Sequence, residues 1–161
     1  MGELTVRSEH MTLGYWNRPE ETDRLLREGW LYTGDLARFD EDGFLYLSGR
    51  SKDMLISGGF NIYPAELEAV LSSHPVVMES GVVGIPDPDW GEVAVAFVAT
   101  APDTQVAHDE LEAFCKPLLG IRTPRRFRSM RALPKNVNGK IDKIQLRELA
   151  LKEFGAGRAG E

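Results

Sequence analysis

The pattern of apolar residues changes near residue 50, and this change limits the folds open to the chain. Before it, short alternating segments such as residues 4–7 are separated by turn residues, a pattern typical of antiparallel strands. After it, strand patterns alternate with helical patterns, which is typical of a sheet covered by helices. The sequence therefore predicts an α+β fold. We expect a β-rich segment over residues 1–49, then a small α+β domain with a mixed sheet and packed helices over residues 50–161.

The expected elements of the α+β domain can be assigned from their periodicity. Residues 76–85 and 93–99 are rich in β-branched side chains and alternate, so both are predicted strands. The remaining elements are strands expected over residues 54–56 and 126–130 and helices expected over residues 64–71, 111–119 and 144–154.

The β-rich segment contains signals for one hairpin and one short helix. Residues 40–43 end in a glycine that takes the positive φ of a tight turn, so residues 36–39 and 44–47 are predicted partner strands. A helix is expected to begin with Asn17 as its possible cap and to end at Gly29. So few strands bury too little apolar surface to be stable alone, and we expect this segment to be the end of something larger.

Composition is that of an ordinary protein with a packed core. Of 161 residues, 42% are hydrophobic and 27% charged, which excludes a disordered or fibrous chain. No apolar run approaches the roughly 20 residues of a membrane helix, and the first residues lack a signal-peptide pattern. The single cysteine, Cys115, cannot form an internal disulfide and is interpreted as a small apolar residue on a helix. We therefore expect a cytoplasmic protein without a membrane segment.

The charges are unevenly distributed along the chain. The net charge of −6 argues against a nucleic-acid partner. Residues 116–147 nevertheless hold ten basic residues and one acidic residue, whereas residues 50–115 hold two basic and eleven acidic. This segregation indicates one anionic partner bound at one place, and a merely solvated basic face is the alternative.

Three short motifs carry the chemistry. In Tyr32-Thr33-Gly34-Asp35 a carboxylate follows a glycine, where it either accepts hydrogen bonds from sugar hydroxyls or only stabilises a turn. The second motif is Gly49-Arg50-Ser51-Lys52-Asp53 with Ile56-Ser57-Gly58-Gly59-Phe60-Asn61-Ile62-Tyr63-Pro64-Ala65-Glu66-Leu67-Glu68. The third is Leu133-Pro134-Lys135-Asn136-Val137-Asn138-Gly139-Lys140-Ile141-Asp142-Lys143, which presents a lysine behind an Asn-Gly turn.

In this order and at this spacing, the motifs resemble the C-terminal part of the adenylate-forming enzymes. These are the acyl-CoA synthetases, the luciferases and the adenylation domains of peptide synthetases, and the similarity covers essentially the whole chain. Residues 52–64 are most similar to acid–CoA ligases, malonyl-CoA synthetase-like members included. Peptide-synthetase domains usually carry a Gly-x-Arg/Lys-Ile-type stretch, where this sequence has Phe60-Asn61-Ile62.

The resemblance implies a reaction in two halves. A carboxylic acid first attacks the α-phosphate of Mg-ATP, which gives an acyl-adenylate and pyrophosphate. The small C-terminal domain then rotates, and the thiol of CoA displaces AMP. The phosphate loop, the adenine pocket, the Mg²⁺ ligand and the acyl pocket belong to a large N-terminal adenylation domain, of which residues 1–49 are expected to be the closing segment. The Mg²⁺ ligands are therefore expected outside this chain.

The resemblance also implies roles for single residues. Asp35 is expected to hold the ribose hydroxyls of ATP or AMP, with Arg50 supporting the same ribose, and Lys52 falls at the hinge of the rotation. Lys140 is expected to be catalytic in adenylation, because a long cation neutralises charge where the carboxylate and the phosphoryl oxygens converge. Without its motif, Lys140 would be interpreted as a solvent-exposed loop lysine.

A second set of residues is expected to bind CoA. Gly58 and Gly59 would let the pantetheine arm approach the backbone closely, although they also fit an ordinary flexible turn. Trp90 would stack on that arm, or it is simply a half-buried surface tryptophan. The candidates for the CoA phosphates are Arg122, Arg125 and Arg126. No metal site is expected, because the three histidines match no metal-binding or triad pattern.

Three functions remain open on this evidence. The chain is either a fragment of an ATP-dependent acid–CoA ligase of fatty-acid metabolism, inactive alone, or a stand-alone non-catalytic module that binds CoA, nucleotide or a partner. In the third alternative, the chain is part of an adenylation domain that serves a carrier protein. The acid itself is not indicated, because no residue of the acyl pocket is present.

Overall fold

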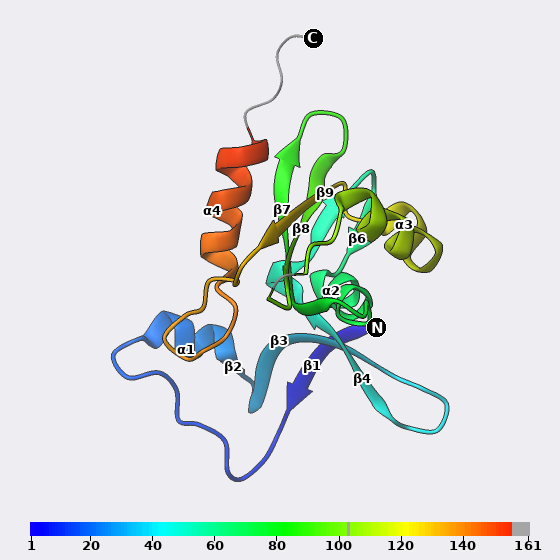
Figure 1. The fold of residues 1–161 in the computed structure, drawn as a ribbon. Helices are drawn as coiled ribbons and strands as arrows, with labels where there is room; N and C mark the ends of the chain where they lie inside the picture. Colours follow the sequence, from blue (N-terminus) through cyan, green and yellow to red (C-terminus); the bar gives the residue numbers. More distant parts are fainter. Residues whose placement is uncertain (103, 156–161) are drawn as a thin grey trace. The chain divides into compact units, whose positions relative to one another are not determined.

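The computed structural model describes residues 1–102 and 104–155 (Figure 1). The chain divides into two compact units between Lys52 and Asp53. The sequence predicts this boundary within residues 49–53, with the β-rich segment assigned to residues 1–49.

The first unit is an antiparallel sheet with one short helix. The long strand β3 pairs with β1, β2 and β4, so it forms the centre of the sheet. The elements are β1 (Gly2–Val6), α1 (Pro19–Leu25), β2 (Leu26–Arg27), β3 (Trp30–Phe39) and β4 (Leu45–Arg50).

The predicted hairpin is confirmed, because β3 and β4 are joined by a turn at residues 40–43. The Asp40 carboxylate accepts hydrogen bonds from the backbone N–H groups of Asp42 (3.1 Å) and Phe44 (2.8 Å). The bond from Phe44 is the main cause that lowers the pKa of Asp40. Gly43 has a φ of +85°, as the turn prediction requires.

The predicted ends of the short helix are wrong. Helix α1 begins at Pro19 with Arg18 at the cap position, and the side chain of Arg18 makes no capping bond. Asn17, the expected cap, lies in the left-handed region with a φ of +53°. The helix already ends at Leu25 because the chain turns into β2. Gly29, with a φ of +79°, follows Glu28, with a φ of +51°, in the tight turn between β2 and β3.

Apolar side chains of the first unit are mostly exposed. Among residues 1–52, all of which the structure describes, Ala37 is the only buried hydrophobic residue. Trp16 is 90% exposed, and Phe39, Phe44 and Leu47 are also exposed. A sheet normally buries one apolar face against another layer, and this unit contains no such layer of its own.

The second unit is built on a five-stranded mixed sheet. Strand β8 is central: β7 pairs antiparallel along its whole length, and β9 pairs parallel with its second half. Its first residue, Gly91, pairs with Ser57 of β5, whose other neighbour is β6. The elements are β5 (Leu55–Ser57), β6 (Phe60–Ile62), α2 (Pro64–Ser72), β7 (Val77–Asp87), β8 (Gly91–Thr100), α3 (His108–Leu119), β9 (Arg126–Met130) and α4 (Lys143–Phe154), with short 3-10 helices at Ser51–Asp53 and Gly120–Arg122.

Helices cover both faces of this sheet (Figure 1). Ala94, Ala96 and Val98 of β8 pack with α2 and α3, whereas Val95 and Phe97 pack with α4. Residues 93–99 therefore form an unbroken apolar run, since both faces of β8 are buried. The second unit confirms the predicted α+β fold with a mixed sheet and packed helices.

The single cysteine lies inside this core. Cys115 on α3 is completely buried, and burial raises its thiol pKa to about 11. A thiolate is needed for nucleophilic attack or metal binding, so Cys115 acts as a packing residue, in agreement with the sequence interpretation.

Candidate functional site

The predicted ribose contacts lie side by side in the first unit. Asp35 of β3 and Arg50 of β4 are register partners, and Arg50 Nε donates to Asp35 Oδ1 at 3.0 Å. Arg50 Nη2 also donates to the carbonyl of Thr33 (3.1 Å), while Thr33 Oγ1 accepts the Asp35 N–H (3.0 Å). Asp35 is therefore held in place, and no described residue donates to its second oxygen. Sequence reasoning gave Thr33 no role, although a threonine hydroxyl in a turn often bonds the backbone N–H two residues later.

Lys52, the predicted hinge residue, is the last residue of the first unit and belongs to the 3-10 helix Ser51–Asp53. It lines an open surface hollow together with Gly34 and Arg50. Charged residues of both signs, Glu3 and Arg24 among them, line the same hollow. The hollow therefore holds the residues of the first two motifs next to one another.

Three of the predicted CoA contacts form one stack in the second unit. Gly58, in the turn between β5 and β6, has a φ of +56°, and its N–H donates to the carbonyl of Trp90 (2.9 Å). A Cβ on Gly58 would lie 2.6 Å from the ring of Trp90. The guanidinium of Arg125 lies over that ring, 3.5 Å from its centroid. The half-buried ring thus contacts both the backbone at Gly58 and the cation of Arg125.

The other predicted CoA contacts differ in their surroundings. Gly59 has a φ of +82°, and a Cβ there would meet no atom within 4 Å, so its outer side is open. Arg126 is exposed and donates to the carbonyl of Arg125 (2.9 Å). Arg122 is held in an ion pair with Glu66 of α2 (2.5 Å). This pairing makes Arg122 a tether between α2 and the segment after α3, which the sequence did not indicate.

Lys140 projects from a hairpin over residues 135–141, the Lys140 hairpin, whose two arms are hydrogen-bonded to each other. Asn136 N–H donates to the Lys140 carbonyl (2.8 Å), and Asn136 Oδ1 accepts the Lys140 N–H (3.1 Å). Gly139 takes a φ of +75° at the tip, which favours glycine. Lys140 is exposed, and within residues 1–102 and 104–155 its ammonium forms no ion pair. The hairpin thus presents one unpaired cation.

The Gly58 turn and the Lys140 hairpin lie at opposite ends of the sheet (Figure 1). The Gly58 turn follows Ser57, which pairs with Gly91 at the start of β8. The hairpin is tied through Lys135 to Glu79, whose register partner is Ala99. Gly91 and Ala99 are eight residues apart on β8, which is about 27 Å along an extended strand.

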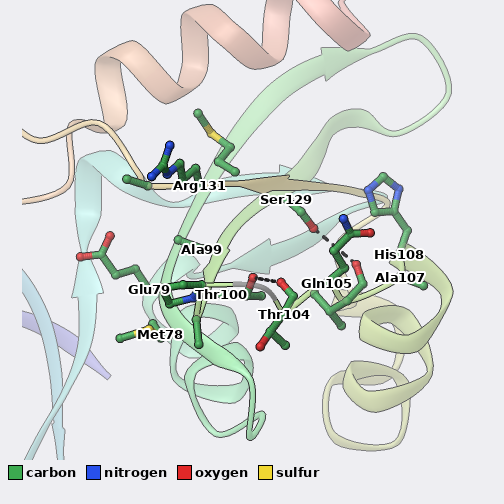
Figure 2. Close-up of a pocket in the computed structure, with 15 residues that line it drawn as sticks. Met78, Glu79, Ala99, Thr100, Thr104, Gln105, Ala107, His108, Ser129 and Arg131 are labelled. Atoms are coloured by element: carbon green, nitrogen blue, oxygen red, sulfur yellow. Dashed lines mark hydrogen bonds between the residues drawn. The ribbon is translucent and has the colours of Figure 1, made fainter.

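A groove of about 1550 Å³ opens at the same end of the sheet as the Lys140 hairpin. Figure 2 shows its lining, which includes Glu79 of β7, Thr104 and Gln105 after β8, and Arg131 directly after β9. Within this lining, the Thr100 hydroxyl donates to the carbonyl of Thr104 (2.6 Å). No sequence-predicted site residue lines this groove, so it stays outside the candidate site.

The parts of the chain that the structure describes contain no group of three or more His, Cys, Asp or Glu side chains able to hold a metal ion. Across the same parts, no helix has the length and apolar character needed to cross a membrane.

Comparison with known proteins identifies relatives of this chain. Residues 66–140 match the AMP-binding enzyme C-terminal domain. The chain is 45% identical over 149 residues to a 2-succinylbenzoate–CoA ligase of Bacillus mycoides, which covers 92% of this chain and 31% of that protein. The chain thus spans about a third of the length of the curated relatives it matches.

Solved structures agree with this likeness. An amide bond synthetase from Marinactinospora thermotolerans matches with a TM-score of 0.85 and 42% identity, over 92% of this chain and 30% of that one. The o-succinylbenzoate CoA synthetase of Bacillus subtilis, in complex with its acyl-adenylate intermediate, matches with a TM-score of 0.84 and 41% identity, over 91% and 30%. The chain therefore belongs to the adenylate-forming enzymes and contains their AMP-binding C-terminal domain.

Proposed function

We propose that this chain is the C-terminal part of an ATP-dependent acid–CoA ligase. The observation that carries the proposal is the arrangement of the second unit, with the Lys140 cation at one end of the sheet and the Gly58–Trp90–Arg125 stack at the other. Two sites this far apart on one rigid body suit a reaction in which the body presents each end in turn. The 2-succinylbenzoate–CoA ligase relatives support the same reaction class.

In the adenylation half-reaction, Lys140 would neutralise charge between the carboxylate substrate and the α-phosphate of ATP. A preorganised cation is effective there because negative charge concentrates as nucleophile and phosphoryl oxygens converge. Asp35 would accept hydrogen bonds from the ribose hydroxyls through its second oxygen, with Arg50 holding the carboxylate in place. Mg²⁺ would neutralise charge on the phosphates, and the residues that bind this Mg²⁺ would lie outside this chain.

In the thioester half-reaction, the domain would rotate about Lys52 and present the opposite end of the sheet. The open outer side of Gly59 would accommodate the pantetheine arm of CoA, and the uncovered part of the half-buried Trp90 ring would pack against it. Arg126 would bind the CoA phosphates. Arg122 and Arg125 fit that role less well, because Glu66 and Trp90 already engage their guanidinium groups.

The partner of the first unit would be the N-terminal adenylation domain. The exposed apolar side chains of residues 1–52 support this proposal, since the unit contains a sheet without its own apolar cover. The relatives are about three times as long as this chain, so they have room for such a domain. We also propose a cytoplasmic location for the ligase, and the free, buried Cys115 is compatible with a reducing compartment.

The decisive test is Lys140→Ala in the full-length ligase. Adenylate formation, measured by ATP–pyrophosphate exchange, should fall by roughly 10²–10³, the usual cost of losing one charged stabiliser of a transition state. Conversion of supplied acyl-adenylate and CoA to thioester should stay nearly unchanged. Lys116→Ala, at an exposed lysine of α3, is the matched control. Equal losses in both half-reactions, with a lower melting temperature, would assign Lys140 a structural role only.

A second candidate differs only in the acyl acceptor. The likeness to an amide bond synthetase favours testing an amine beside CoA and a phosphopantetheine carrier protein. Supplied acyl-adenylate should react fastest with CoA. A faster reaction with the amine or the carrier would show that CoA is not the preferred acyl acceptor. The proposed role in adenylation would not be affected. If the chain is instead a non-catalytic binding module, it should bind CoA while the full-length protein shows no exchange.

A further inference from the structure

The Lys140 hairpin is held to the body of the domain by two ion pairs that the proposed mechanism does not use. We propose that Glu68 and Glu79 are positioning residues that fix where Lys140 points; this inference rests on the proposed role of Lys140 in adenylation. The hydrogen bonds inside the hairpin define its shape but not its direction. Its direction depends on contacts outside the hairpin.

The first ion pair lies on the incoming arm of the hairpin. Lys135 pairs with Glu79 of the edge strand β7, and the side chain of Glu79 is 31% exposed. Lys135 also forms an isolated β-bridge with Ile141, so both arms move with it. The contact therefore ties the base of the hairpin to the sheet.

The second ion pair lies on the outgoing arm. Lys143, the first residue of α4, places its ammonium 2.8 Å from Glu68 of α2. The same carboxylate oxygen of Glu68 accepts the backbone N–H of Val82 in β7 at 2.8 Å, and the side chain is 22% exposed. A charge-assisted bond to fixed backbone holds Glu68 still, so Lys143 is drawn to a rigid point.

Two anchors on opposite arms restrict the hairpin more than either does alone. One contact leaves a rigid body free to swing about it, whereas two contacts on different arms define an axis. Leu133 and Ile141 pack into the apolar cluster under α4 and limit the remaining rotation. The Lys140 ammonium sits at the end of a long side chain, so a small tilt at the base moves it by a large distance. A misplacement of about 1 Å in a reacting group can cost about 10²-fold in rate.

The first experiment measures the position of the hairpin without any activity. Backbone ¹⁵N relaxation of this chain should give order parameters near 0.8 for residues 136–140, falling below about 0.6 in Glu68→Gln/Glu79→Gln. Values for β7 and β8 should not change. Glu153→Gln removes a comparable ion pair with Arg128 (2.9 Å) that does not touch the hairpin, and it should have no effect. Unchanged order parameters in the double variant would overturn the proposal.

The second experiment uses the full-length ligase. In Glu68→Gln/Glu79→Gln, kcat for ATP–pyrophosphate exchange should fall about tenfold while KM for ATP and thioester formation from supplied acyl-adenylate stay constant. Exchanging the charges in Glu79→Lys/Lys135→Glu should restore most of the loss from Glu79→Gln. Equal losses in both half-reactions, or no rescue, would show that the ion pairs only stabilise the fold. Absence of exchange in the unaltered ligase would refute the proposed function, and the relaxation data would still decide whether the anchors hold the hairpin.

Discussion

Replacing Gly58 with alanine should destabilise the second unit more than the same change at the neighbouring Gly59. Both residues have a positive φ, +56° and +82°, so each alanine introduces left-handed backbone that costs about 1–2 kcal/mol. Only at Gly58 would the new Cβ meet another group, the ring of Trp90 at 2.6 Å. Both variants therefore lose stability through backbone strain, and only Gly58→Ala also loses stability through the clash with Trp90.

The extra cost at Gly58 comes from moving the Trp90 ring. The ring packs against the apolar cluster under α4 and lies beneath the guanidinium of Arg125. Displacing it loses packing and part of the cation–π contact, which together amount to about 1–3 kcal/mol. We expect the free energy of unfolding to fall by about 1–2 kcal/mol in Gly59→Ala, and by about 2–5 kcal/mol in Gly58→Ala.

Urea unfolding followed by far-ultraviolet circular dichroism measures this difference, because α2, α3 and α4 supply most of the helical signal. With a slope of about 2 kcal/mol per molar urea, the midpoint of Gly58→Ala should lie about 1 M below that of Gly59→Ala. In a Trp90→Leu background the excess cost should shrink, since the clashing ring is gone. Equal midpoints for the two alanine variants would refute the assignment of Trp90 to a fixed position over Gly58.

The remaining predictions concern single groups and the isolated chain. Cys115 should not react with a thiol reagent at pH 8 in the folded chain and should react on unfolding, because burial raises its pKa to about 11; fast labelling of the native chain would contradict this. The pKa of Asp40 lies below its ordinary value, chiefly through the bond from Phe44 N–H, so its contribution to stability is present at neutral pH. That contribution should disappear as the pH falls through the lowered pKa, and a carboxyl titration by NMR at the ordinary value would disprove it. Gly59→Leu in the full-length ligase should slow thioester formation more than adenylation, with the melting temperature separating this effect from backbone strain. The chain alone should catalyse no ATP–pyrophosphate exchange with any carboxylic acid; measurable exchange from a pure sample would refute its assignment as an incomplete ligase.

Most of the fold follows from local patterns in the sequence. The alternation over residues 76–99 predicts β7 and β8, and the helical periods predict α2, α3 and α4 within a few residues. These predictions succeed because each element buries a face that its own spacing defines. The ends of α1 were wrong because the turn at Glu28 and Gly29 pairs β2 with β3, and that pairing outweighs the local helix signals.

The sequence by itself also determined the family and predicted the residues for its chemistry, because the motifs around Asp35, Gly58 and Lys140 are contiguous stretches of chain. Only the tertiary structure decided how these residues are held. Arg122 pairs with Glu66, and Lys143 pairs with Glu68, across separations of more than fifty residues. Ion pairs of this kind depend on how helices pack against a sheet, and no local pattern records that packing. For the same reason, only the folded chain places the Gly58 turn and the Lys140 hairpin at opposite ends of one strand, β8.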